Sequence, residues 1–147
     1  MSSHTFHEIY LHVNWHTKDS QPLITASVEP AIHAFFADRC RQFGGVTVHG
    51  IGGTPTHIHM AIQIEPQICI SELIGDLKGA CSHEINQQSR MKRLQWQRGF
   101  GVVSFGKKQL PWVLDYVAHQ KEHPATGRTE PRLEWVSRDE DGAPMDG

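Results

Sequence analysis

The 147-residue sequence is poor in cysteine and has no long hydrophobic run. Its three cysteines, Cys40, Cys69 and Cys81, are odd in number and lie among apolar residues. They therefore predict reduced thiols and not a disulfide framework. No apolar run approaches the roughly 20 residues that span a bilayer, and residues 1–10 lack the features of an export signal. These absences predict a cytoplasmic protein with no membrane partner, and the length suits one domain.

The net charge of −2 does not by itself indicate nucleic-acid binding, but the charge is unevenly distributed. Residues 78–121 carry eight Lys or Arg and two acidic residues, whereas residues 1–77 carry three and seven. Residues 122–147 are again acidic, with three basic and seven acidic residues. The middle of the chain would thus offer a basic surface to phosphates, or only a solvated charged face.

Hydrophobic periodicity predicts four strands and three helices in the order β-α-β-β-α-β-α. The predicted strands cover residues 7–17, 46–51, 57–64 and 100–105, and the predicted helices cover residues 28–43, 69–88 and 110–123. The order of the first six elements predicts a ferredoxin-like α+β fold, in which a four-stranded antiparallel sheet carries two helices on one face. The C-terminal helix is an addition. We expect one domain over residues 1–123, followed by a polar, acidic and partly disordered tail over residues 124–147.

Two histidines share one face of the third predicted strand. In "TPTHIHMAIQI", His57 and His59 alternate with apolar residues. In a ferredoxin-like sheet the first and third strands are adjacent, so His12 and His16 would neighbour this pair. The two imidazoles are either core or surface residues without a task, or two ligands that converge on one metal ion.

The last predicted helix places Trp112, Tyr116 and Gln120 on one face, at i, i+4 and i+8. Next to a metal ion, a tyrosine can attack phosphorus and form a covalent phosphotyrosine, because the cation favours the phenolate and polarises the phosphate. The other interpretation is a structural tyrosine whose ring packs on the sheet.

Several motifs together resemble one family. His57-Ile58-His59 resembles the His-hydrophobic-His signature of HUH nucleases, and "DYVAHQKEH" resembles the Tyr-x-x-x-Gln helix of their single-tyrosine branch. "LKGACSHEIN", "LQWQRGFGVVSF" and "LHVNWHTKDSQPLIT" match that branch in order and spacing. These are the small transposases of insertion sequences of the 200/605 group, and the likeness covers roughly residues 7–123.

The resemblance implies a ferredoxin-like fold and a DNA-joining reaction. By resemblance, His57, His59 and Gln120 would bind Mg²⁺ or Mn²⁺, and Tyr116 would attack single-stranded DNA, keeping the 5′ phosphate and releasing a 3′-hydroxyl. Family members act as homodimers on DNA that contains a hairpin, often with the tyrosine helix of one subunit completing the other's site. Many relatives have Asp before the HUH pair, whereas this chain has Thr56. That departure and the acidic composition raise the chance of a domesticated relative.

Basic residues in the middle of the chain would neutralise DNA phosphates, and nearby aromatic rings would stack on unpaired bases. The predicted phosphate contacts are Lys78, Arg90, Lys92, Arg93, Arg98, Lys107 and Lys108. Trp96 and Phe100 either stack on bases or anchor the fourth strand. There are two alternatives to a transposase. One is a relative that binds DNA hairpins without cutting them, and the other is a histidine-rich metal-binding protein.

Overall fold

One antiparallel sheet with the strand order β2-β3-β1-β4 organises the molecule. The computed structural model describes residues 5–89, 93–122 and 130–136. The strands are β1 (Ile9–His16), β2 (Val46–Thr54), β3 (His57–Ile64) and β4 (Gly101–Phe105). The helices are η1 (Lys18–Ser20), α1 (Glu29–Phe43), α2 (Ile70–Ser89), η2 (Lys107–Gln109), α3 (Leu110–Ala118), η3 (Gln120–Glu122) and α5 (Pro131–Glu134). The ferredoxin-like prediction is confirmed, because β1 and β3 are the central pair.

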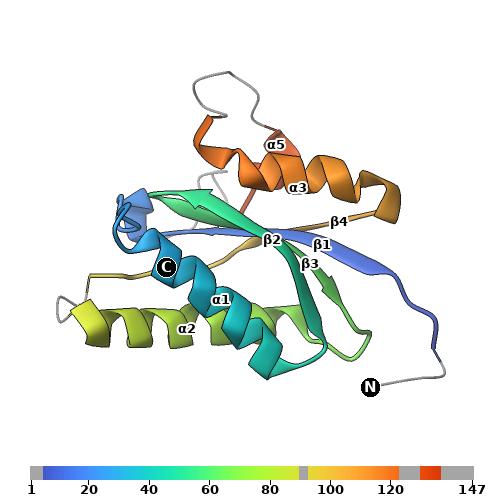
Figure 1. Cartoon of the computed structure of the whole chain (residues 1–147), viewed down its shortest axis with the longest axis horizontal. Helices are drawn as coiled ribbons and strands as arrows, with labels where there is room; N and C mark the ends of the chain where they lie inside the picture. The colour runs from blue at the N-terminus through green and yellow to red at the C-terminus, as the bar shows by residue number, and fades with distance from the viewer. Residues whose placement is uncertain (1–4, 90–92, 123–129, 137–147) are drawn as a thin grey trace.

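Helices cover the two faces of the sheet unequally. Figure 1 shows α1 and α2 on one face, and α3 with α5 on the other. The α1 and α2 face holds the main core, to which β1 contributes Leu11, Val13 and Trp15, all at most 4% exposed. These residues alternate along the strand with side chains of the opposite face. The large core therefore fixes the sheet from one side and leaves the other side for polar residues.

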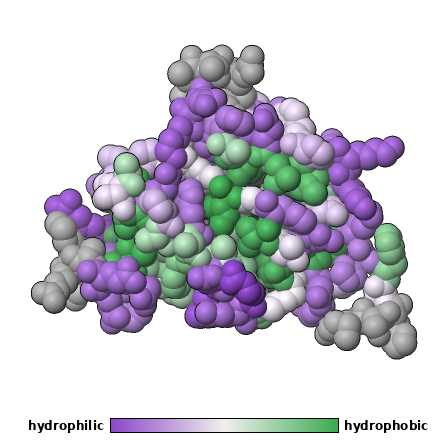
Figure 2. Space-filling view, viewed as in Figure 1, coloured by the Kyte–Doolittle hydropathy of each residue, from purple (hydrophilic) through white to green (hydrophobic). Residues whose placement is uncertain are grey.

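A smaller apolar contact seats α3 on the opposite face. Val113 and Val117 pack on the buried Ala61 of β3. The backbone of α3 also comes very close to β2, because a Cβ atom built on Gly52 would lie 1.9 Å from the carbonyl oxygen of Val117. In Figure 2, apolar residues gather in the middle of the face shown and hydrophilic residues surround them. Because residue 52 is a glycine, the backbone of α3 can lie this close to β2.

The predicted C-terminal helix and tail differ from the structure. The α-helix ends at Ala118, and Gln120 lies in the separate turn η3. Within the predicted tail, residues 131–134 form α5, which contacts β1 and β4. Residues 124–129 and 137–147 of that tail lie outside the described residues. Among the described residues, no helix is long and apolar enough to cross a membrane.

Candidate active site

Two histidine pairs meet on the α3 face of the sheet, at the end of β1 and the start of β3. The register places His57 opposite His16. The ring of His16 stacks on that of His57, with centroids 4.9 Å apart, and His12 Nε2 lies 2.8 Å from His59 Nδ1. The prediction that the histidines of the first strand neighbour the HUH pair is confirmed.

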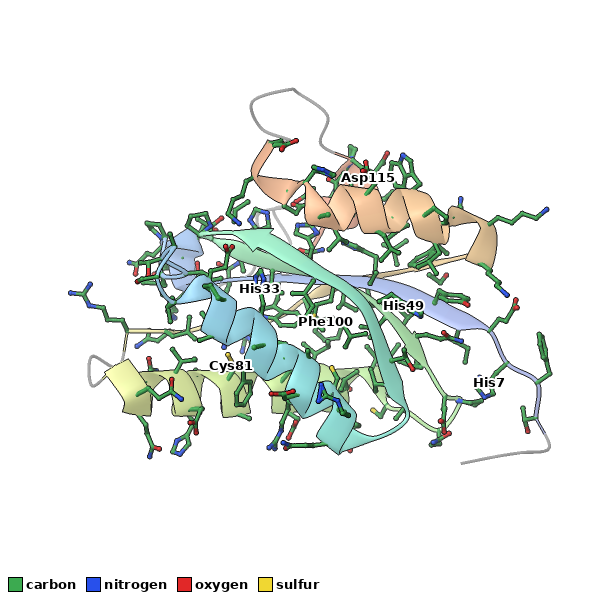
Figure 3. All side chains as sticks on the ribbon, in the orientation of Figure 1. His7, His33, His49, Cys81, Phe100 and Asp115 are labelled. Carbon is green, nitrogen blue, oxygen red and sulfur yellow. The ribbon has the colours of Figure 1, made fainter. Side chains whose placement is uncertain are left out.

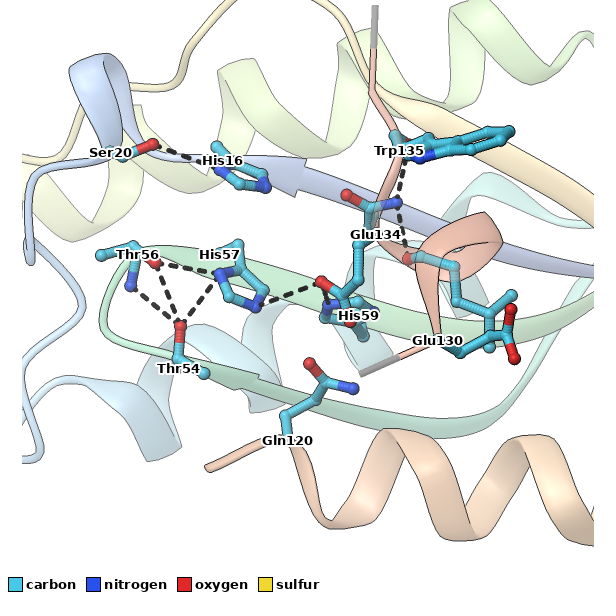
Figure 4. Close-up of polar contacts among 12 residues, drawn as sticks. His16, Ser20, Thr54, Thr56, His57, His59, Gln120, Glu130, Glu134 and Trp135 are labelled. Carbon is cyan, nitrogen blue, oxygen red and sulfur yellow. Dashed lines mark hydrogen bonds and ion pairs between the residues drawn. The ribbon is translucent and has the colours of Figure 1, made fainter. Parts of the chain in front are cut away.

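Each imidazole of the HUH pair is oriented through its Nδ1 atom. His57 Nδ1 lies 3.0 Å from Thr54 Oγ1 and 2.9 Å from Thr56 Oγ1, and His59 Nδ1 contacts His12. Figure 4 shows the threonine contacts on His57. Groups that orient a ligand's ring from behind fix its direction. Threonine hydroxyls therefore orient His57, and both Nε2 atoms face the carboxylate of Glu134.

Glu134 of α5 lies directly in front of these Nε2 atoms. Its Oε1 atom is 3.3 Å from His59 Nε2 and 3.8 Å from His57 Nε2. One ligand atom from each of the three side chains lies within 4.8 Å of the others. The sequence analysis missed Glu134, because it placed residues 124–147 outside the domain. The apolar neighbours Leu133 and Trp135, which interrupt a polar stretch, were the available signal.

The sheet is shaped to receive α5. Asn14 is 1% exposed, and its amide Nδ2 donates to the carbonyl oxygens of Leu133 and Trp135, at 3.0 and 3.1 Å. A Cβ atom built on Gly101 would lie 1.7 Å from the Trp135 carbonyl oxygen. Leu133 is 5% exposed. A buried amide on β1 and a glycine on β4 therefore hold the segment that carries Glu134.

Tyr116 completes the group from α3. It is 4% exposed, and its ring centroid lies 6.1 Å from that of His59. Its hydroxyl donates to Glu134 Oε2 and accepts from the backbone N–H of Glu130 at 2.9 Å. Burial and the hydrogen bond to Glu134 raise the pKa of the phenol well above its usual value. The phenol is therefore protonated at neutral pH in the metal-free protein.

Gln120 is close to the same centre and is 2% exposed. Its amide Nε2 donates to the backbone oxygen of Tyr116 at 3.1 Å, and its side chain hydrogen-bonds His57. It reaches this position from η3, which follows the end of α3. Tyr116, His57, His59 and Gln120, which the sequence selects from different elements, thus lie together in one chain.

The donor set fits a divalent cation. Burial, followed by the neighbouring His59, lowers the pKa of His57 to about 4 and that of His12 to about 3. At neutral pH these imidazoles are uncharged. Two imidazole nitrogens and a carboxylate oxygen facing one point form a ligand set that transition-metal ions accept. Among the described residues, His57, His59 and Glu134 form a group that could hold such an ion.

Of the predicted DNA contacts, two described arginines precede β4 and two lysines follow it. Arg93 and Arg98 are exposed and lie just before β4, whereas Lys107 and Lys108 are exposed and follow it. Gly101 at the start of β4 pairs with Asn14, beside the histidines, and Phe105 at its end pairs with Tyr10. Arg98 follows Gln97, whose backbone N–H donates to the carbonyl oxygen of His16, so Arg98 lies nearer the site. Leu94, next to Arg93, instead hydrogen-bonds Asn86 of α2. Arg90 and Lys92 lie outside the described residues.

Lys78 and the predicted stacking rings make contacts inside the fold. Lys78 Nζ donates to the carbonyl oxygens of Gln97 and Gly99, at 2.8 and 2.9 Å. Trp96 Nε1 donates to the Lys78 carbonyl oxygen at 2.9 Å. Trp96 and Phe100 pack against the main core, and Figure 3 shows Phe100 between the sheet and α2. For both aromatic residues, the structure favours the anchoring interpretation.

Replacement of Lys78 by alanine is expected to lower the free energy of unfolding by about 1–3 kcal/mol, because the Gln97 and Gly99 carbonyls lose a charged donor. A urea titration measures this. Lys107→Ala, which removes the same charge from an exposed position, should unfold at the wild-type midpoint. An unchanged midpoint for Lys78→Ala, together with weakened DNA binding, would instead make Lys78 a DNA contact.

Comparisons with known proteins identify the family of this sequence. Residues 5–120 match the family described as "Transposase IS200 like". The transposases for insertion sequence element IS200 of Salmonella typhimurium strain LT2 and Salmonella typhi are each 34% identical over 77 residues. Those matches cover 48% of this chain and 50% of each relative, so the aligned part spans about half the length of either.

Solved structures share the fold. A protein from Deinococcus radiodurans R1, provisionally described as a transposase, superposes with a TM-score of 0.65 at 16% identity over 80% of this chain and 94% of its own. A REP-associated tyrosine transposase bound to a REP hairpin superposes with a TM-score of 0.60 at 13% identity, over 92% and 80%. With the family match across most of the sequence, these findings establish that the chain belongs to the IS200-like transposase family.

Proposed function

We propose that the protein is a transposase that cleaves and rejoins single-stranded DNA through a 5′-phosphotyrosine on Tyr116, with Mg²⁺ or Mn²⁺ as cofactor. One observation carries the proposal: a single chain holds the Tyr116 hydroxyl beside two imidazoles whose Nε2 atoms face the same point. A structural tyrosine needs no such neighbours. Family membership supports the same chemistry.

The proposed step is an in-line displacement at phosphorus. The Tyr116 oxygen forms a bond to phosphorus, the bond between phosphorus and the 3′ oxygen breaks, and the DNA leaves with a 3′-hydroxyl. The phenol proton is lost and the leaving oxygen gains one. When bound, the divalent ion would polarise the phosphate and stabilise the leaving oxygen. In rejoining, a 3′-hydroxyl attacks the phosphotyrosine and restores the tyrosine.

The proposed substrate is single-stranded DNA that contains a hairpin. The exposed Arg98 supports it, because it follows Gln97, which hydrogen-bonds the backbone of His16. Arg93, beside the end of α2, would contact a more distant phosphate. Lys107 and Lys108 would contact phosphates further away. A homodimer is part of the proposal by resemblance. The described residues of one chain already supply the nucleophile and both imidazoles, so the dimer would serve DNA binding or strand exchange.

Covalent adduct formation tests the proposal. The purified protein is incubated with a pool of DNA hairpins flanked by randomised single strands, with Mn²⁺ or with EDTA. A 3′-labelled pool should give labelled protein on a denaturing gel, and a 5′-labelled pool should give shortened strands, only with the metal. Salt-sensitive binding without an adduct would favour the alternative, a relative that binds hairpins without cleaving them.

Trp112 is a candidate base-stacking platform that the sequence analysis did not select for DNA binding. It is 54% exposed and stacks on Tyr116, with centroids 5.6 Å apart and planes inclined by 28°. Trp112→Ala is expected to weaken single-stranded DNA binding by about 1–3 kcal/mol, because an unpaired base loses its stacking partner. Fluorescence anisotropy measures this. Phe43→Ala, which removes an exposed ring from the end of α1, should leave the affinity unchanged; equal losses would contradict a specific role.

A further inference from the structure

The two oxygens of the Glu134 carboxylate face two different partners. Oε1 faces the Nε2 atoms of His57 and His59, and Oε2 accepts the hydrogen bond from the Tyr116 hydroxyl. Figure 4 shows Glu134 between the histidines and the rest of α5. One side chain therefore contacts both parts of the proposed chemistry, the metal-facing imidazoles and the nucleophile.

The spacing around Oε1 matches that of ligands to a common ion. Two donors bound to one ion at about 2.1 Å are separated by roughly 3.0–3.4 Å. The distance of 3.3 Å between Oε1 and His59 Nε2 lies in this range, and the distance of 3.8 Å to His57 Nε2 needs only a small adjustment. Both rings are held from behind through Nδ1, so their Nε2 atoms point toward Oε1.

The position of Glu134 is determined by contacts on both sides of it. Asn14 binds the carbonyl oxygens of Leu133 and Trp135, the residues on either side of Glu134. Gly101 leaves room for the second of these oxygens. The backbone N–H of Glu130 holds the Tyr116 hydroxyl from the other end of the segment. These contacts make residues 130–135 an integral part of the centre.

We propose that Glu134 is a protein ligand of the divalent ion and at the same time positions the Tyr116 hydroxyl, so that one carboxylate links the cation to the nucleophile. This inference rests on the proposed function. It assigns Gln120, which the resemblance makes a ligand, to bracing Tyr116 and His57. An imidazole pair alone suits Zn²⁺ or Ni²⁺, and a carboxylate oxygen shifts the set toward the harder Mn²⁺.

Direct measurement of Mn²⁺ binding tests the inference independently of DNA cleavage. Electron paramagnetic resonance reports free Mn²⁺ during titration of the wild type, Glu134→Gln and Glu130→Gln. We expect Glu134→Gln to weaken Mn²⁺ binding by at least about 10-fold, since changes even behind the ligands cost 10–100-fold. Glu130→Gln removes the same charge from the same segment but contacts Tyr116 through its backbone, so it should bind Mn²⁺ as the wild type does. Gln120→Ala should change the affinity less than Glu134→Gln.

The adduct assay supplies the second readout. If Glu134 also positions the nucleophile, Glu134→Gln should form the adduct at least 10-fold more slowly even at saturating Mn²⁺. Wild-type Mn²⁺ affinity in Glu134→Gln would overturn the ligand assignment, and a faster adduct would show that α5 covers the nucleophile. If the wild-type protein binds Mn²⁺ through Glu134 but forms no adduct, the proposed function is refuted and the assignment of Glu134 as a metal ligand still holds. Thermal unfolding without metal verifies that each variant folds.

Discussion

Replacement of Tyr116 by phenylalanine is expected to abolish the covalent protein–DNA adduct, because a phenyl ring has no oxygen to bond to phosphorus. The ring is 4% exposed and keeps its packing in the variant. The Glu130 N–H and the Glu134 carboxylate lose their partner, so the free energy of unfolding should fall by about 1–3 kcal/mol. DNA and Mn²⁺ affinities should stay close to the wild-type values. The denaturing-gel assay and urea unfolding measure the two effects.

Tyr10 provides the matched control, because the sequence has two tyrosines. Tyr10 is 6% exposed and pairs with Phe105, at the opposite end of β1 from His16 and His57. Tyr10→Phe removes the same atom from an equally buried ring and should form the adduct at the wild-type rate. Adduct formation by Tyr116→Phe, or its loss in Tyr10→Phe, would place the nucleophile elsewhere.

Replacement of Gly52 by alanine is expected to damage both the fold and the reaction. The new Cβ atom would lie 1.9 Å from the carbonyl oxygen of Val117 and 2.9 Å from its carbonyl carbon, and neither backbone atom can rotate away. The α3 helix must therefore move off the sheet, at a cost of about 1–3 kcal/mol or more. Tyr116 adjoins Val117, and a displacement of about 1 Å at a reacting group costs on the order of 10²-fold in rate.

Gly79 on α2 supplies the comparison. A Cβ atom built there has no heavy-atom neighbour within 4 Å. Gly79→Ala should thus raise the free energy of unfolding by about 0.5–1 kcal/mol, because alanine favours a helix, and should leave the adduct rate unchanged. Urea unfolding and adduct kinetics compare the two variants. If Gly52→Ala is as stable and as fast as the wild type, the close approach of α3 to β2 is not required.

The local sequence pattern predicts the sheet and the histidine pairs. Alternation along residues 57–64 selects which side chains share a face, and the order of elements makes β1 and β3 neighbours. Together they bring His12 and His16 to His57 and His59, as the structure shows. This success has a physical basis, because the period of a strand is local and the ferredoxin-like connection leaves few alternative strand orders.

Strand periodicity and element order do not predict long-range contacts of single side chains. Glu134 lies in a short helix whose place depends on a buried amide at Asn14 and on a missing side chain at Gly101. Neither feature has a periodic signal. The basic pattern likewise did not distinguish Lys78, whose ammonium binds two backbone carbonyls, from exposed Arg98. The sequence shows how many basic residues a segment carries, but the packing determines which of them are exposed to a ligand and which bond the protein's own backbone.

The alternation of β1 has a consequence for how this protein tolerates change. Odd-numbered positions such as Leu11 and Val13 face the main core, and even-numbered positions such as His12 and Asn14 face the side that carries α3 and α5. Repacking for heat resistance is thus best confined to odd positions. Even positions such as His12 and Asn14 are also buried, but Asn14 holds the segment that carries Glu134, and His12 contacts His59.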